Sequence, residues 1–266
     1  MSRLSLLVAL IWISLASFGL GCRKPPVAQK AELVAAYSFD EGTGTTVTDL
    51  SGHSNIGTIV NATWTSEGKF GTALDFNGTN AWVLINHSPS LNLTTGMTLE
   101  VWVNPVFLPP LGCRPDQTCS WMDVIHKDSD RYYIEASSDS GQKPEAGGIF
   151  ANGKHVVFGW SRLPLNTWSH LALTYDGATI RFYINGVEEE TMDQSSPLTT
   201  SDHPLFIGGD QTQGQFFHGR IDEVRVFNGA RTAAEVLSDM STPVGSKVPL
   251  QQNNLSKMSM TRNAGL

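Results

Sequence analysis

The sequence predicts an all-β protein, an antiparallel sandwich or barrel with one short C-terminal helix. Three observations lead to this prediction. Segments in which apolar and polar residues alternate are short and follow one another closely, glycine accounts for 25 of the 266 residues, and charged residues make up only 16%. Closely spaced short strands separated by Gly, Asn, Asp and Pro are typical of sandwiches and barrels, not of alternating β and α units.

Residues 168–187 form the clearest segment of this pattern. Apolar side chains recur there at every second position along two strands, at Leu171, Leu173 and Tyr175 and then at Ile180, Phe182 and Ile184. Asp176-Gly177 separates the two strands and Asn185-Gly186 follows the second. Both pairs suit tight turns, because their residues tolerate positive φ at little steric cost. The segment therefore predicts a β-meander with one apolar face.

The same reading along the chain predicts further strands, at 33–39, 58–62, 73–76, 82–85, 97–104, 123–126, 132–136, 148–150, 156–160, 205–207 and 219–227. A helix is expected at Thr232–Met240, where Thr232 can act as N-cap and Glu235 follows three residues later.

The chain is expected to carry a leader, a tether, one folded domain and a tail. Residues 1–21 have the positive start, apolar region and small residues of a signal peptide. The Gly-Leu-Gly-Cys sequence resembles the bacterial lipoprotein processing box, which implies that Cys22 receives diacylglycerol. Residues 22–32 contain two prolines and no apolar period, as in a short tether. The domain is expected at 33–240, and the polar segment 241–266 is expected to be a disordered tail.

Export implies an oxidising compartment, periplasmic or at the cell surface, and lipidation would fix the protein to the membrane. There, Cys113 and Cys119 could form a disulfide within a Pro-rich segment, and the alternative is a pair of free thiols. No Cys/His spacing suggests zinc. The formal charge is −7 without any long basic run, which makes nucleic acid a poor candidate partner.

Several segments resemble a known family in their order and spacing: VAAYSFDEGTGTTVTDLSGHSNIGTI, GKFGTALDFNGTNAWV, MTLEVWVNP, WSHLALTYDGATIRFYINGV and FIGGDQTQGQFFHGRIDEVRVFNGARTAAEV. Together they are similar to the laminin-G-like jelly-roll group of the concanavalin A-like lectin/glucanase superfamily. The resemblance implies a jelly roll of two antiparallel sheets packed face to face. This fold hosts lectins, adhesion modules and polysaccharide-cleaving enzymes, so it does not choose among them.

The resemblance also implies a structural calcium ion. The matching positions are Asp40, the backbone near Gly57, and Asp222, and calcium takes oxygen ligands of these kinds. In the sequence RIDEVRVF, Asp222 alternates in phase with valines and is expected to point toward the buried side or its rim, where a lone carboxylate is costly. The alternative is an ion pair of Asp222 with Arg220 or Arg225, with Asp40 opening a turn.

Glycosidases of this superfamily carry two glutamates and an aspartate on one strand, and nothing here matches that pattern. Glu188, Glu189 and Glu190 are consecutive, so alternate side chains face opposite sides of a strand. They are expected to form a solvated edge. Glu100 and Glu135 belong to different predicted strands, and no spacing indicates that they meet.

Sugar binding needs an exposed aromatic ring with polar neighbours. Four tryptophans in family-like strands are expected in the core: Trp64, Trp82, Trp102 and Trp168. Trp121 and Trp160 are better candidates, and a rim of Trp121, Arg131, Tyr133 and Trp160 is the predicted ligand surface, with core packing as the alternative.

The sequence thus predicts a lipid-anchored envelope protein whose domain is a non-catalytic recognition or adhesion module for a glycan or glycoprotein. A carbohydrate-active hydrolase or lyase and a purely structural surface protein are the alternatives. Exposed aromatic residues beside amides would favour recognition, whereas carboxylates about 5 to 10 Å apart on the concave sheet would favour an enzyme.

Overall fold

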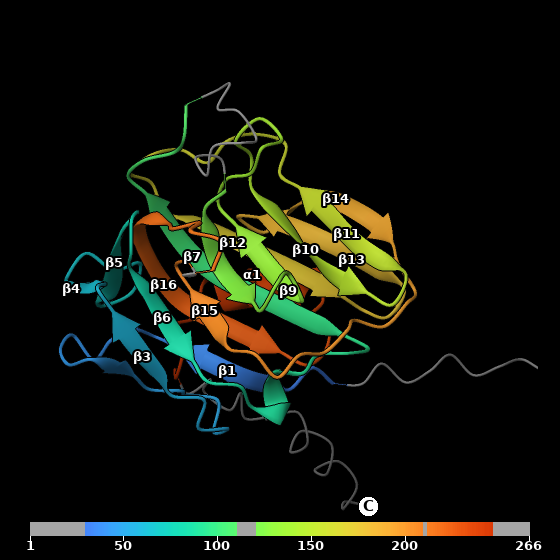
Figure 1. Ribbon diagram of the computed structural model, residues 1–266, viewed down its shortest axis with the longest axis horizontal. Helices are drawn as coiled ribbons and strands as arrows, with labels where there is room; N and C mark the ends of the chain where they lie inside the picture. The colour runs from blue at the N-terminus through green and yellow to red at the C-terminus, as the bar shows by residue number, and fades with distance from the viewer. Residues whose placement is uncertain (1–29, 111–120, 210–211, 247–266) are drawn as a thin grey trace, which may run out of the picture.

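The alternating segments assemble into two antiparallel sheets packed face to face in the computed structural model, which describes residues 30–110, 121–209 and 212–246 (Figure 1). One 3₁₀ helix, η1 (Pro89–Leu91), and one α-helix, α1 (Ala233–Met240), accompany the sheets. The predicted all-β jelly-roll sandwich with one short C-terminal helix is confirmed.

Sheet A has eight strands. In spatial order they are β14 (Val187–Asp193), β13 (Thr179–Ile184), β12 (Ser169–Tyr175), β7 (Met97–Pro105), β16 (His218–Phe227), β5 (Ala73–Asn77) and β4 (Thr63–Thr65), with β1 (Leu33–Tyr37) also paired to β16. The long strand β16 pairs with β7 along one edge. Its other edge is shared, because β5 pairs with the first half of β16 and β1 with the second half.

Sheet B also has eight strands. Their order is β11 (Gly153–Phe158), β10 (Glu145–Phe150), β9 (Tyr132–Glu135), β8 (Asp123–Lys127), β15 (Leu205–Ile207), β6 (Trp82–Ile85), β3 (Gly57–Val60) and β2 (Thr46–Val47). The sequence did not predict β2, β4 or β14. β2 and β4 have only two and three residues, too few to show a period.

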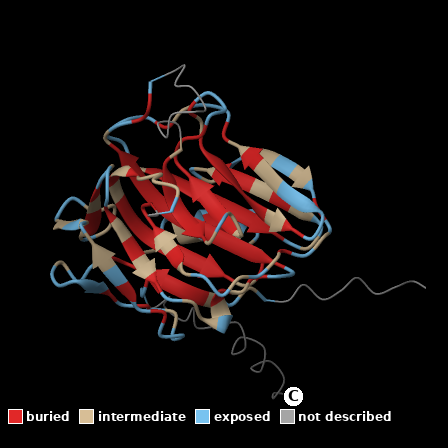
Figure 2. Ribbon diagram, viewed as in Figure 1, coloured by how far each residue is buried: buried red, intermediate tan, exposed pale blue. Residues whose placement is uncertain are grey.

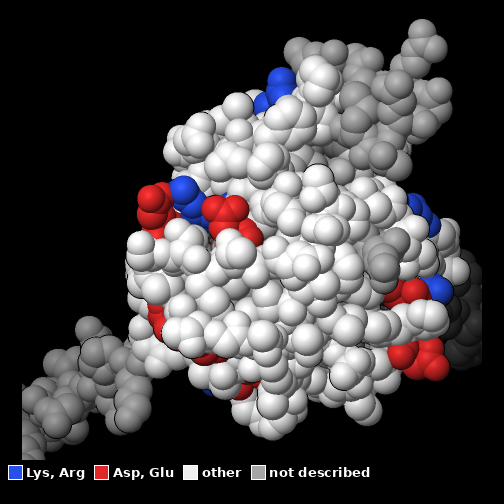
Figure 3. Space-filling model, turned by 60° about the vertical axis from the view of Figure 1, so that its left-hand side comes forward, with Lys and Arg blue, Asp and Glu red and all other residues white. Residues whose placement is uncertain are grey.

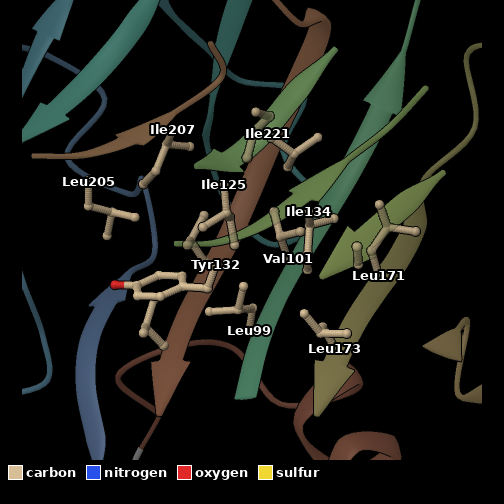
Figure 4. Close-up of a cluster of buried hydrophobic side chains, with 14 of the residues drawn as sticks. Leu99, Val101, Ile125, Tyr132, Ile134, Leu171, Leu173, Leu205, Ile207 and Ile221 are labelled. Carbon is tan, nitrogen blue, oxygen red and sulfur yellow. The ribbon is translucent and has the colours of Figure 1, made fainter. Parts of the chain in front are cut away.

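The space between the sheets is filled by apolar side chains from both inner faces. Leu99, Val101, Leu171, Leu173 and Ile221 of sheet A meet side chains of sheet B there (Figure 4). The residues from sheet B include Ile125, Tyr132, Ile134, Leu205 and Ile207. Burial runs through the middle strands of both sheets and decreases toward β3, β4 and β14 (Figure 2). Removing this apolar surface from water is the dominant stabilising contribution to the fold.

The meander at 168–187 forms as expected, and it continues into β14. Asn185 has φ of +51° and Gly186 has φ of +77°, as a tight turn with two positive φ angles requires. β14 is a charged edge strand, so its sequence shows no apolar alternation. The expected solvated edge at 188–190 is only partly present. The carboxylates of Glu189 and Glu190 accept hydrogen bonds from the backbone N–H groups of Trp160 and Phe158, at 2.8 and 2.6 Å.

Part of the outer face of sheet A, over β12 and β13, is covered by α1. Thr232 caps this helix and forms the predicted capping box with Glu235. Val236 on its buried side packs against Ala172 and Tyr183. None of the helices in the described part of the chain is long and apolar enough to cross a membrane.

The boundaries of the folded domain lie slightly outside the predicted 33–240. Before β1, the Glu32 N–H donates to Asn228 Oδ1 at 2.9 Å. After α1, the Val244 N–H donates to Glu223 Oε2, and Val244 is 8% exposed. The first part of the predicted tail, 241–246, therefore packs on the sandwich.

Candidate functional site

Three connections meet at one end of the sandwich and enclose a cavity of about 370 Å³. They are the β5–β6 turn, the described residues just after β7 and just before β8, and the segment that leads into β16 (Figure 1). The residues that line the cavity are Asn77, Gly78, Thr79, Phe107, Pro109, Trp121, Met122, Gly214, Phe216 and His218. We call this cavity the end pocket.

Aromatic rings dominate the walls of the end pocket. Phe107 follows β7 and is 48% exposed, and Trp121 precedes β8 and is half-buried. The Phe107 and His218 ring centroids lie 6.0 Å apart, and Phe216 stacks on Trp82 with centroids 5.9 Å apart and planes 26° apart. Trp82, expected in the core, instead supports this wall. The end pocket thus offers partly exposed ring faces, and the rings of Phe107 and Phe216 lie against neighbouring rings.

The β5–β6 turn supplies the polar side of the end pocket. The Asn77 side-chain oxygen accepts hydrogen bonds from the N–H groups of Thr79 and Asn80, at 2.9 and 3.0 Å. Gly78 has φ of +71°, and a Cβ at this position would lie 2.7 Å from the Cβ of His218. The turn therefore needs glycine for its backbone and for the close approach of His218, and it places amide and hydroxyl groups beside the aromatic rings.

The described lining of the end pocket includes no Lys, Arg, Asp or Glu. Figure 3 shows one face of the molecule, on which charged side chains gather toward the margins and the middle is uncharged. The aromatic rings and the amide and hydroxyl groups of this described lining suit a polar ligand that also has an apolar face.

The four residues of the predicted rim do not form one surface. Trp121 lines the end pocket, whereas Tyr133 is 0% exposed and donates its hydroxyl hydrogen to Glu145 Oε1 at 2.5 Å. Arg131 is tied to Thr199 and Asp128.

The fourth residue, Trp160, is 67% exposed and follows β11. Trp121 precedes β8, which is three strands away from β11 in sheet B. At the usual spacing between neighbouring strands, β8 and β11 are about 14 Å apart. The two tryptophans therefore lie at the same end of sheet B but apart.

Sequence reasoning found Trp121 but missed Phe107 and His218. In the sequence, the only available signal for Phe107 was an aromatic residue within a Pro-rich connection. The position of His218 depends on its pairing with Asn77, a contact between residues 141 positions apart in the chain. No local pattern reveals such a contact.

A second cluster lies on the outer face of sheet B, where three neighbouring strands place carboxylates in one row. Asp123 on β8 is directly opposite Glu135 on β9, which is directly opposite Glu145 on β10. Burial and the charges of Asp123 and Glu145 raise the pKa of Glu135 well above its usual value, and burial also raises the pKa of Glu145.

These carboxylates are only 0, 3 and 6% exposed, so little of them is available for contact with a sugar. Although the spacing of neighbouring strands would suit an acid/base pair, the burial of the row does not favour the hydrolase or lyase alternative.

Comparison with known proteins finds the same fold and the superfamily that the sequence resembles. Residues 77–237 match the family model Laminin_G_3, described as the concanavalin A-like lectin/glucanases superfamily. The chain belongs to this superfamily. The match covers β6 to β16, which include strands of both sheets, and all the described residues of the end pocket.

Among curated proteins, this superfamily member is similar to pappalysin-1. It is 31% identical to the Mus musculus protein over 176 residues, which is 58% of this chain and 10% of that protein. It is 36% identical to the Homo sapiens protein over 133 residues, which is 46% of this chain and 8% of that one. The chain therefore spans about a tenth of the length of the curated relatives it matches.

Solved structures share the fold at low identity. Domain 4 of AbnA, a GH43 extracellular arabinanase from Geobacillus stearothermophilus, was solved in complex with arabinotriose. It has a TM-score of 0.60 and 23% identity, over 80% of this chain and 100% of that one. The binding domain of Paraclostridial Mosquitocidal Protein 1 has a TM-score of 0.62 and 16% identity, over 79% and 52%.

A third structure is the ligand-binding domain of botulinum neurotoxin serotype D in complex with N-acetylneuraminic acid. It has a TM-score of 0.59 and 10% identity, over 79% of this chain and 50% of that one. At these identities the likeness shows the fold alone.

The residues predicted to hold calcium divide between two places. The turn 69–72 brings two of them near each other, because Asp222 Oδ2 accepts the N–H groups of Lys69 and Phe70 and Asp40 Oδ1 accepts that of Thr72. Gly57 lies in β3 of sheet B. Among the described residues, no group of three His, Cys, Asp or Glu side chains is arranged to hold a metal ion. The calcium ion stays a prediction from the sequence.

The alternation of Asp222 with the valines indicated the core side of β16. The Asp222 side chain is buried, but on the opposite face of the strand. A bulge between Asp222 and Arg225, with Glu223 at φ of +57°, shifts the phase of β16. Asp222 is therefore opposite Trp102 on the outer face, and it is buried beneath the turn 69–72. The predicted ion pairs are absent as well, because Arg225 pairs with Glu223 and Arg220 with acidic residues of other segments.

The remaining predicted sites lie outside the described residues. These are Cys22, with the leader 1–21, and the pair Cys113 and Cys119.

Proposed function

We propose that the protein is a non-catalytic carbohydrate-recognition module that binds a neutral glycan, free or on a glycoprotein, in the end pocket. The observation that supports this most is the partly exposed pair of rings, Phe107 and Trp121, beside the amide and hydroxyl groups of the β5–β6 turn. Two proteins that share the fold were solved with saccharides, arabinotriose in one and N-acetylneuraminic acid in the other.

The chemistry of sugars explains why such a pocket suits them. The C–H groups on one face of a sugar ring pack on an aromatic ring, while its hydroxyl groups exchange hydrogen bonds with amides, hydroxyls and imidazoles. Phe107 and Trp121 supply the rings, and Thr79 and His218 supply polar groups within the same cavity. The Phe107 ring lies against the His218 ring before binding, so little of its side-chain entropy is lost on association.

Replacing Phe107 or Trp121 with alanine is expected to weaken glycan binding about tenfold or more, because each change removes one stacking surface. A glycan array selects the saccharide for the wild-type protein, and isothermal titration calorimetry then compares the variants. Trp160→Ala is the matched control, since Trp160 is 67% exposed and does not line the end pocket. Loss of binding in the control with retention in the two pocket variants would contradict the proposal.

We further propose that a lipid on Cys22 presents this module at the bacterial membrane, as the leader sequence predicts. A diacylated cysteine anchors a protein without a spanning helix. Changing Cys22 to Ala is therefore expected to abolish the incorporation of labelled palmitate into the protein, which autoradiography after immunoprecipitation measures. Unchanged incorporation would count against the anchor.

A further inference from the structure

A second cavity, of about 250 Å³, opens on the outer face of sheet B and is separate from the end pocket in its lining. Its residues are His126, Asp128, Ser129, His203, Pro204, Phe206, Thr212 and Gln213. We call this cavity the face pocket. His126 of β8 and Phe206 of β15 are directly opposite each other in the ladder, so the imidazole and the phenyl ring are neighbours on that face.

The walls of the face pocket are held in place by the buried side chain of Lys127. Its ammonium group donates hydrogen bonds to the backbone oxygens of Ser201 and His203, the first at 3.2 Å. These bonds tie the segment that precedes β15 to the end of β8. His203 Nδ1 also lies 3.6 Å from Asp128 Oδ1. The cavity is therefore formed before any ligand arrives, which lowers the entropic cost of binding.

The lining of the face pocket has the chemistry that a sugar residue requires. Phe206 is half-buried and offers a ring surface, while the His203 side chain is 66% exposed. The Asp128 carboxylate accepts hydrogen bonds and the Ser129 hydroxyl both donates and accepts them. An apolar ring beside a carboxylate, an imidazole and a hydroxyl can engage the C–H face and the hydroxyl groups of one sugar ring.

One segment of chain lines both cavities. Thr212 and Gln213 belong to the face pocket, and Gly214, Phe216 and His218 belong to the end pocket. The two pockets are therefore neighbours that share residues 212–218 as a wall. A linear chain of sugars that fills one pocket can continue across this wall into the other.

We propose that the face pocket is a second sugar subsite and that one oligosaccharide spans both pockets. This inference rests on the proposed function of the end pocket. Filling two linked subsites makes the second contact intramolecular, so the affinity rises with chain length beyond the gain from a single site. A glycan too short to cross the wall gains nothing from the second pocket.

The test compares saccharides of three and six residues, in the arabinan series and in the cellulose series, by isothermal titration calorimetry. In the series that binds, the wild-type protein is expected to bind the hexasaccharide at least about tenfold more tightly than the trisaccharide. His203→Ala and Phe206→Leu are expected to remove this gain while leaving trisaccharide binding in the end pocket unchanged. His53→Ala is the matched control, because His53 lines neither pocket. Thermal midpoints check that each variant is folded.

The outcomes separate this inference from the one on which it rests. Binding of the trisaccharide without a gain from chain length, or a gain that both face-pocket variants retain, would overturn the second subsite alone. Failure of every saccharide in both series to bind would count against the glycan-binding function, and the second subsite would be rejected with it.

Discussion

Replacing Gly208 with alanine is expected to lower the free energy of unfolding by about 2–5 kcal/mol. Gly208 has φ of +83°, and a Cβ there would lie 2.2 Å from two ring atoms of the buried Phe76. The left-handed backbone costs an L-residue about 1–2 kcal/mol, and overpacking a core costs about 1–3 kcal/mol. The two effects add because Phe76 packs between the sheets and has little room to move.

Gly214→Ala is the matched control for this change. Gly214 lies in the same segment at φ of +72°, but no atom of the described residues lies within 4 Å of a Cβ placed there. Its replacement is therefore expected to cost only the backbone strain, about 1–2 kcal/mol. Urea unfolding of the two variants measures the difference, and equal losses would contradict the account of packing at Gly208.

The consequence of Gly208 for function follows from its backbone bonds. Its N–H donates to the Val124 oxygen and its oxygen accepts from the Phe217 N–H, both at 3.0 Å. These bonds hold both ends of the segment that lines the end pocket and the face pocket. Gly208→Ala is therefore expected to weaken glycan binding in addition to its effect on stability.

The stability of the wild-type protein is expected to fall as the pH rises from 6.5 to 8. Burial raises the pKa of Glu100 and of Asp222 to about 8 each, and burial lowers the pKa of His170 to about 3. Glu100 is 0% exposed, and neither of its carboxylate oxygens has a hydrogen-bond partner among the residues that the structure describes. In this pH range the unfolded chain has lost these carboxyl protons, whereas the folded chain still holds them.

The direction of the effect follows from linkage. The folded state binds more protons than the unfolded state up to about pH 8, so the free energy of unfolding decreases with rising pH, by about 1–2 kcal/mol for each group over this range. The neutral form of His170 is favoured by folding, and its contribution is lost only as the pH falls below its ordinary value of 6.5. Because half of the unfolded chains still carry this proton at pH 6.5, His170 opposes the trend by only about 0.4 kcal/mol between pH 6.5 and 8.

Glu100→Gln is expected to reduce this slope, because glutamine stays neutral at every pH. Chemical unfolding at pH 6.5, 7.25 and 8 gives the slope directly, so any constant cost of the new amide does not affect the result. Glu188→Gln removes the same carboxyl group from a half-exposed position on β14 and is expected to leave the slope unchanged. A Glu100→Gln slope equal to that of the wild type, or stability that rises over this range, would contradict the argument.

Local patterns in the sequence predicted the parts of the fold that depend on local chemistry. The alternation at 169–184 gave β12 and β13, and Asn185-Gly186 gave the turn after them. Thr232 and Glu235 gave the start of α1. β14 was missed because its charged sequence has no apolar period, although it is a strand through its pairing with β13. The bulge at Glu223 was missed because the packing around β16 sets it.

The site was harder to predict, because it depends on which distant segments become neighbours. Trp121 was a candidate from its composition and context. Phe107 and His218 join it only because β7 and β16 are antiparallel neighbours, so that β7 ends where β16 begins. The carboxylate row likewise follows from the registers of β8, β9 and β10, which the sequence does not state. The face pocket forms only because β15 pairs with β8, which places Phe206 opposite His126, a residue 80 positions earlier in the chain.

A crystal structure of the protein soaked with the saccharide selected on the glycan array tests the central claim most directly. We expect electron density for a sugar ring against Phe107 and Trp121, with its hydroxyl groups toward the turn 77–79. Density at another surface, with the end pocket empty at a saturating saccharide concentration, would contradict the claim that this pocket recognises glycans.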